Sequence, residues 1–200
     1  MNKKETQHLV TIKKKNDAQG SYRIYPSFII SPKKIHIGYK TLAKNLENQK
    51  IIILDGYIGV DWNEVKHELS SALQNEGLRV NTSNINKCLK SENEIKQLVK
   101  PFLGGDDPIF GSKTSLILSD YFDENKISNI KLDPNADVNI IYGTGASQSN
   151  IEGFLVYFDL PKNELQFRMR ANAVTNLGFS SGKNHKQMYK HFYFVDWEVL

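Results

Sequence analysis

A loop between a predicted strand and a predicted helix holds residue types that bind phosphate in many α/β proteins. It spans Asp55–Trp62 and follows the apolar run Ile51–Leu54. Glycine lets backbone amides approach an anion, and a helix N-terminus adds unpaired N–H groups and the positive end of its dipole. We therefore predict that Gly56 and Gly59 present amides to a phosphate, and that Tyr57 stacks on a base or a sugar. The competing interpretation is an ordinary glycine turn.

The same loop lacks the groups that a kinase uses to hold a nucleotide. A Walker A loop has the form G-x-x-x-x-G-K-[ST], in which the lysine contacts the phosphates and the hydroxyl binds Mg²⁺. Here Gly56 and Gly59 are too close together, and Asp61 stands where these groups belong. A nucleotide with Mg²⁺ stays a candidate cofactor if another cation replaces the missing lysine. Four basic residues are candidates for that role: Lys66, Lys113, Arg168 and Arg170.

A second glycine loop and an arginine follow later strands. Gly143 and Gly145 come after the apolar run Val138–Tyr142, and Arg168 lies in a helix predicted to start near Pro161. Ligands of open α/β sheets bind at the carboxyl ends of the strands, so these residues are expected to line the same crevice as the first loop. A plain loop and a solvated arginine are the competing interpretations. The candidate ligand contacts are Gly56, Tyr57, Gly59, Gly143, Gly145 and Arg168.

Other patterns give weaker indications of chemistry. Asp106 and Asp107 suit a metal ion or a catalytic base, but a turn is the favoured interpretation. The five histidines are scattered, Cys88 is the single cysteine, and no serine lies in a nucleophile motif. We therefore predict no metal site and no hydrolase triad.

The order of the predicted elements favours an α/β fold. Helices are predicted at 40–49, 62–76, 91–102 and 161–173, with Asp61 and Ser91 as N-caps for the second and third. Strands are predicted at 51–54, 78–81, 116–118, 138–142, 154–158 and 189–200. This alternation predicts a three-layer α/β/α sandwich with a mostly parallel sheet. Short strands at 8–12, 22–25 and 34–37 are assigned to an N-terminal arm at 1–39, in front of a kinase-like domain at 40–200.

The composition excludes several classes of partner. Of the 200 residues, 40% are hydrophobic and 24% are charged, which is ordinary for a globular chain. The formal charge of +4 comes largely from five lysines in the first fifteen residues, without the aromatic or arginine readers of a nucleic-acid surface. No apolar run is long enough for a membrane span. We expect a cytoplasmic protein with no nucleic-acid or membrane partner.

The layout of residues 51–173 resembles the uridine kinase and phosphoribulokinase group of P-loop kinases. Leu155–Asp159, followed by Arg168 and Arg170, looks like the late strand and the arginine-rich lid helix of that group. Asn139–Gly143 resembles the strand before it, with its terminal glycine. The departure from the Walker A pattern makes this a degenerate P-loop-like layout.

Four segments resemble certain bacterial class I mannose-6-phosphate isomerase-like proteins, in the region that precedes their catalytic cupin. The segments are Asp55–Val60, Pro101–Pro108, Asp159–Glu164 and Phe192–Trp197. The resemblance implies a link to sugar-phosphate isomerisation and a cupin isomerase domain as a candidate partner. The Gln, His and Glu residues that bind zinc in those cupins have no matching set here.

Three hypotheses for function follow. The first is a non-catalytic or weakly catalytic accessory domain that binds a sugar phosphate or a nucleotide. The second is an atypical small-molecule kinase, which magnesium-dependent ATP turnover would reveal. The third is a structural or oligomerisation domain, in which the aromatic strand predicted at 189–200 pairs with a partner.

Overall fold

The computed structural model describes residues 34–182 and 184–200. The chain divides into two compact units, residues 1–37 and 38–200, and every element below belongs to the second. The strands predicted at 8–12 and 22–25 lie outside the described residues. The strand predicted at 34–37 is wrong, because this stretch has no strand pairing.

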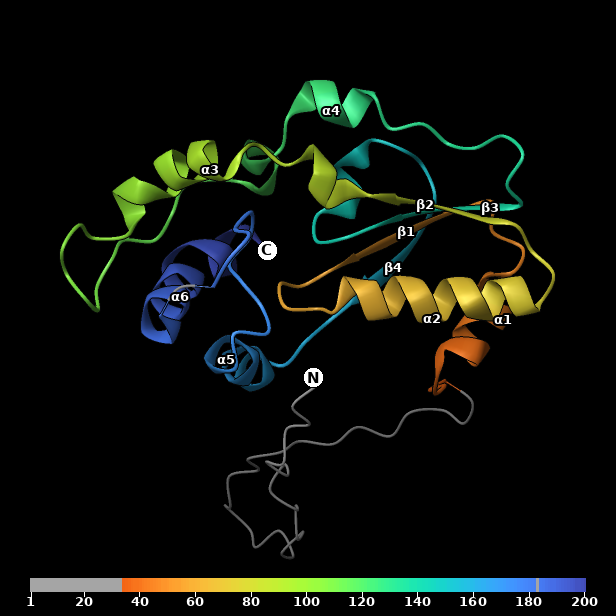
Figure 1. Ribbon diagram of the computed structural model, residues 1–200, viewed down its shortest axis with the longest axis horizontal. Helices are drawn as coiled ribbons and strands as arrows, with labels where there is room; N and C mark the ends of the chain where they lie inside the picture. Colours follow the sequence, from red (N-terminus) through yellow and green to blue (C-terminus); the bar gives the residue numbers. More distant parts are fainter. Residues whose placement is uncertain (1–33, 183) are drawn as a thin grey trace, which may run out of the picture. The chain divides into compact units, whose positions relative to one another are not determined.

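A four-stranded parallel sheet forms the centre of the domain (Figure 1). Its strands are β1 (Ile51–Gly56), β2 (Val80–Asn84), β3 (Val138–Tyr142) and β4 (Phe154–Phe158). They lie in the order β2-β3-β1-β4, and each neighbouring pair is parallel. The predicted α/β fold with a parallel sheet is therefore confirmed.

Two helices cover one face of the sheet. They are α1 (Tyr39–Leu46) and α2 (Trp62–Asn75). Leu69 and Leu73 of α2 are fully buried against Ile52 and Leu54 of β1 in one apolar cluster. The helix starts where predicted, because the Asp61 carboxylate accepts hydrogen bonds from the backbone N–H groups of Asn63 and Glu64.

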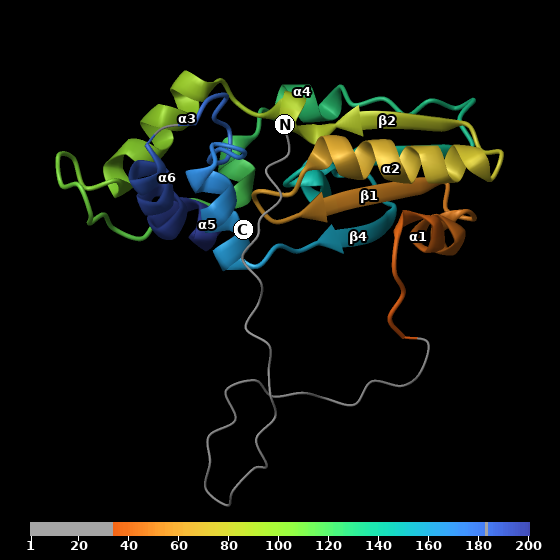
Figure 2. The same cartoon turned by 60° about the horizontal axis from the view of Figure 1, so that its bottom comes forward.

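A second apolar cluster begins on the opposite face of the sheet and continues past its carboxyl edge. On the sheet it includes Ile53 and Ile141, which meet short 3-10 turns at Leu118–Tyr121 and Ala146–Ser149. Beyond the edge, Figure 2 shows three helices grouped past the tips of β1 and β4. These are α3 (Glu92–Val99), α5 (Lys162–Arg170) and α6 (His185–His191). The short helix α4 (Glu124–Ser128) lies before β3.

Two predicted strands are wrong. At 116–118 the backbone N–H of Ile117 donates to the Asp120 carboxylate instead of to a neighbouring strand, and a 3-10 turn follows. The segment 189–200 is helical: α6 runs into a π-helical turn at Phe192–Asp196 and then into α7 (Trp197–Val199). The third hypothesis for function thus loses the edge strand on which it was built.

The reason for the C-terminal error is visible in the spacing of the buried residues. Met188, Phe192 and Val195 are all buried, and they are spaced four and three residues apart. That is the period of a helix face, which the aromatic and β-branched composition of the segment masked. By contrast, α3 was predicted from its cap, and Ser91 and Glu94 do form a reciprocal capping box.

Candidate functional site

The connections after β1 and β3 leave the sheet on opposite faces. The chain after β1 enters α2 on one face, whereas the chain after β3 enters the 3-10 turn Ala146–Ser149 on the other. Neighbouring strands with divergent connections make a topological switch point, where open α/β sheets bind ligands in the crevice. The predicted glycine loops lie here, at the carboxyl ends of β1 and β3.

The carboxylate of Asp55 fills this crevice. Its Oδ1 accepts from the backbone N–H of Gly145 at 2.7 Å and its Oδ2 from that of Ser147 at 2.9 Å. Oδ1 also accepts from the N–H of Gly56 at 2.7 Å. Asp55 is buried, and a buried carboxylate needs such donors. The amides that the sequence offers to a phosphate are thus taken by an anion of the chain itself.

The loop after β3 is held on both sides. Gly143 and Gly145 have φ values of 125° and 87°, which favour glycine. A Cβ at Gly145 would lie 2.7 Å from the Phe122 ring. The hydroxyl of Thr144 accepts from the indole N–H of Trp62 at 3.1 Å, which ties the loop to the start of α2.

The glycines at the end of β1 and in the connection after it pack closely against β4 and α5. A Cβ at Gly56 would collide with the carbonyl oxygen of Phe158, and one at Gly59 would lie 2.6 Å from Leu165. Arg168 donates from Nη1 to the carbonyl oxygen of Gly59 and from Nε to Glu164, each at 2.8 Å. Arg168 therefore ties α5 to the β1–α2 connection.

The six predicted contacts consequently form two groups at one edge of the sheet. Gly56, Tyr57, Gly59 and Arg168 lie along the β1–α2 connection and α5, and Gly143 and Gly145 surround Asp55. Contact of any of them with a ligand stays a prediction. Sequence reasoning missed Asp55, although an aspartate directly after a buried strand signals that donors must lie nearby.

An open pocket of about 440 Å³ lies beside the first group. It brings together the β1–α2 connection, the end of β4, the start of α5 and the C-terminal segment. Its lining residues are Tyr57, Tyr157, Asp159, Leu160, Pro161, Lys162, Trp197 and Leu200. Of these, only Tyr57 belongs to the predicted set.

The start of α5 supplies the groups of positive charge that lie at the pocket. Pro161 occupies the N-cap position, and within the described chain no side chain caps the helix. Pro161 and Lys162 line the pocket, so the start of α5 lies at the pocket wall, where an unpaired backbone N–H can donate to an anion. Lys162 is at the same place, with Nζ 2.9 Å from the centroid of the Trp197 ring. Asp159 adds a carboxylate, whose Oδ1 accepts from the N–H of Leu160.

The Tyr57 hydroxyl is a buried donor without a partner. Tyr57 is only 8% exposed, and its hydroxyl makes no hydrogen bond to any described residue. Burial raises the pKa of Tyr57 to about 12, and the charges of Asp196, Tyr157 and Asp159 add to the effect. Tyr157 and Asp159 both line the pocket, so the hydroxyl lies close to it and stays protonated at neutral pH.

Two other predictions concern metals and the acidic loop. In residues 34–182 and 184–200, no group of three or more histidine, cysteine, aspartate or glutamate side chains is arranged to hold a metal ion. Asp107 caps a turn, because its Oδ1 accepts from the N–H groups of Ile109 and Phe110. The favoured interpretation of this loop as a turn is confirmed. None of the helices in the described part combines the length and apolar character that a bilayer span requires.

Comparison with known proteins adds the family. A family model described as Domain of unknown function (DUF8485) matches residues 38–200. The chain belongs to this family. The DUF8485 domain coincides with the second compact unit and contains both the Asp55 crevice and the pocket beside α5. Neither a curated protein nor a solved structure matches the chain.

Proposed function

We propose that the DUF8485 domain binds a phosphorylated small molecule, a sugar phosphate or a nucleotide, in the pocket beside α5. One observation carries the proposal: an uncapped helix start, a lysine and a buried, unpartnered tyrosine hydroxyl meet at one pocket. Each is a hydrogen-bond donor, and the lysine and the helix start also carry positive charge. An unpartnered buried donor is costly, and a bound acceptor would relieve that cost.

The pocket divides into parts that suit the two halves of such a ligand. The phosphoryl oxygens accept from the first turn of α5 and from Lys162, while the Tyr57 hydroxyl donates a further bond. The half-exposed side chain of Tyr157 offers apolar contact to a sugar or a base. Asp159 can accept bonds from hydroxyl groups, which favours ligands that carry them near the phosphate.

Binding is proposed in place of phosphoryl transfer because Asp55 closes the crevice in which a P-loop would hold its nucleotide. A carboxylate there repels phosphate and occupies the amides. The domain is accordingly proposed to be non-catalytic or weakly catalytic.

The wider proposal follows the two resemblances. The strand–loop–helix unit of β1 and α2 and the all-parallel sheet support a degenerate kinase-like layout. The three-layer sandwich is part of that proposal. We further propose a cytoplasmic accessory role beside a mannose-6-phosphate isomerase-like cupin, which would supply the catalytic zinc.

Isothermal titration calorimetry with inorganic phosphate, mannose 6-phosphate, fructose 6-phosphate and Mg·ATP tests the proposal. Lys162→Gln should weaken binding by at least about tenfold, because a charge-assisted hydrogen bond contributes about 1.5–3 kcal/mol. Tyr57→Phe should weaken it by a smaller factor. Lys131→Gln is the matched control, since Lys131 is an exposed lysine in the loop before β3.

Two results would count against the proposal. One is the absence of heat with all four compounds at millimolar concentration. The other is unchanged affinity in Lys162→Gln. Turnover of ATP with Mg²⁺ would favour the atypical kinase instead.

A further inference from the structure

A histidine and an aspartate form a buried pair behind the pocket. His191 ends α6 and Asp196 ends the π-helical turn that follows. Their exposed fractions are 4% and 0%, and His191 Nε2 lies 3.5 Å from Asp196 Oδ1. A charged or polar pair so far from water must be matched internally.

The π-helical turn is what brings the two residues together. In an α-helix, neighbours on one face are three or four residues apart, so residues five apart point in different directions. The wider turn at Phe192–Asp196 removes that offset. A π turn between α-helical segments is rare and is often found at functional sites. The alternative α-helical winding would separate His191 from Asp196.

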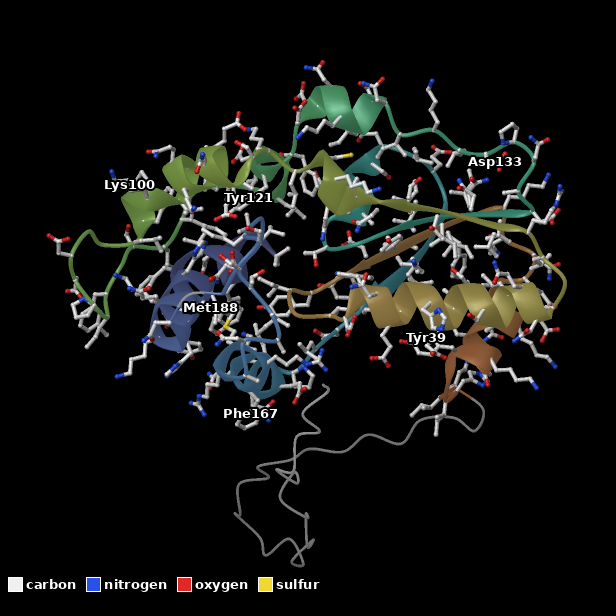
Figure 3. The ribbon with its side chains drawn as sticks, in the orientation of Figure 1. Tyr39, Lys100, Tyr121, Asp133, Phe167 and Met188 are labelled. Atoms are coloured by element: carbon white, nitrogen blue, oxygen red, sulfur yellow. The ribbon has the colours of Figure 1, made fainter. Side chains whose placement is uncertain are left out.

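The groups that face Asp196 come from several elements. Asn176, between α5 and α6, donates from Nδ2 to Asp196 Oδ2 at 2.7 Å, and the backbone N–H of Leu177 also donates to Asp196. The ionisable groups that act on it are His191 from α6, Tyr57 from the β1–α2 connection and Tyr121 from the 3-10 turn before α4. Figure 3 labels Tyr121, whose buried hydroxyl makes no hydrogen bond in the described chain.

The same turn positions the aromatic wall of the pocket. Trp197, which lines the pocket, directly follows Asp196. Phe192 stacks on Trp197 with ring centroids 6.0 Å apart and an angle of 12°. Tyr57 meets the Phe192 ring edge-on at 6.2 Å. A change in the winding between His191 and Asp196 therefore moves the side chains that shape the pocket.

We propose that the His191–Asp196 pair is a proton-operated latch for the pocket. When the pair holds one proton, the π turn is kept and Trp197 stays in the pocket wall. When that proton leaves, the turn relaxes to an α-helix, Trp197 leaves the wall and the affinity for the anionic ligand falls. The ligand part of this inference rests on the proposed function.

The direction of the pH effect follows from burial. Burial raises the pKa of Asp196, and His191 and the donors of Asn176 and Leu177 offset part of that rise. In the folded state Asp196 therefore retains its proton to higher pH than it does in the unfolded chain. An acid with a raised pKa favours the folded arrangement at low pH and disfavours it as pH rises above the ordinary value. The latch thus keeps the π turn, with Trp197 in the pocket wall, at low pH and releases it as pH rises.

The test uses the full chain with Trp62→Phe, so that Trp197 is the single fluorescent indole. We expect one transition in its emission as pH rises above the ordinary pKa of an aspartate, within a scan from about pH 4 to about pH 9. Asp196→Asn preserves the shape and the Asn176 bond but cannot ionise, so it should abolish the transition. His191→Gln should do the same, and circular dichroism checks that both variants fold.

Sulfate serves as the binding probe, because its charge is constant over this range. Its affinity for the parent should fall by about tenfold across the transition, and it should be independent of pH in Asp196→Asn. The absence of a transition in the parent, or an equal transition in folded Asp196→Asn, would overturn the latch. So would sulfate affinity that stays constant while Trp197 titrates. A normal Trp197 transition with no binding of sulfate or phosphate at any pH would support the latch and contradict the proposed function.

Discussion

Two places at the carboxyl edge of the sheet have the backbone geometry of an anion site, and they differ in what occupies them. The loop at Gly143–Ser147 holds the carboxylate of Asp55, whereas no side chain of the described chain caps the start of α5. The first was predicted from its glycines and is closed. The second carries no glycine signature and is open. Glycine spacing therefore indicates where amides converge, but not whether the chain itself supplies the anion.

The largest expected effect comes from removing the resident anion. Asp55→Ala leaves the buried N–H of Gly145 and the part-buried N–H of Ser147 without acceptors, so the free energy of unfolding should fall by about 3–5 kcal/mol. Urea unfolding measures this loss. Asp106→Ala removes an exposed aspartate and should change stability by less than about 0.5 kcal/mol. Equal effects in the two variants would show that the crevice does not depend on Asp55.

Asp55→Ala should also leave the loop at Gly143–Ser147 free to bind an anion from solution. Without the Asp55 carboxylate, the freed N–H groups can donate to acetate or sulfate. Binding of such an anion stabilises the folded state by about 2.7 kcal/mol at one hundred times the dissociation constant. Thermal unfolding of Asp55→Ala with acetate, compared with sodium chloride at equal ionic strength, measures the gain. The native chain should gain less from acetate. If both proteins respond alike, the loop is not an anion cradle.

Alanine substitutions at Gly145 and Gly77 separate two costs in stability: that of a positive φ and that of a steric clash. Gly145 and Gly77 have nearly the same φ, 87° and 86°, but only a Cβ at Gly145 has a neighbour within 4 Å. Each change to alanine should cost about 1 kcal/mol from the backbone, and Gly145→Ala about 1–3 kcal/mol more from contact with Phe122. Chemical denaturation of both variants gives the difference. Equal losses would remove the packing role assigned to Gly145.

The smallest effect is expected at Arg168. Arg168→Met loses the bonds to Gly59 and Glu164 and should lower the free energy of unfolding by about 1–2 kcal/mol. Calorimetric titration with phosphate then compares it with Lys162→Gln. If Arg168→Met lowers stability without changing phosphate affinity, and Lys162→Gln lowers phosphate affinity, then Lys162 is the ligand contact and Arg168 is a structural tie. If phosphate affinity falls only in Arg168→Met, the ligand contacts Arg168, as the sequence predicted, and not Lys162.

Local signals made much of the fold predictable. The run Ile51–Leu54, the cap at Asp61 and the capping box at Ser91 each act within a few residues, and each gave an element close to its observed bounds. The strand predicted at 78–81 was found at Val80–Asn84, because its polar residues hide the pairing with β3. The C-terminal helices were predicted as a strand because the aromatic and β-branched composition was given more weight than the helical spacing of the apolar residues.

The candidate sites depend on contacts that are distant in sequence. Asp55 and Gly145 lie 90 positions apart, and the pocket joins Tyr57 to Trp197. No local pattern at Asp55 names its partners, although the cost of burying a carboxylate requires that some exist. Lys162 and the absence of a capping side chain before α5 can be read from the sequence. They indicate a pocket only once β4 and the C-terminal segment are known to lie beside them.

The strand order also governs how the sheet can be completed on the ribosome. Within the described chain β1 pairs only with β3 and β4, and β2 pairs only with β3, so no two of these strands can join until residue 138 has emerged. At about 5–20 residues per second, translation from β1 to β3 takes on the order of ten seconds. Throughout that interval the nascent Ile51–Leu54 has no strand partner. The newborn chain thus carries an unpaired apolar strand for much of its synthesis, and such a segment makes a chain prone to aggregate.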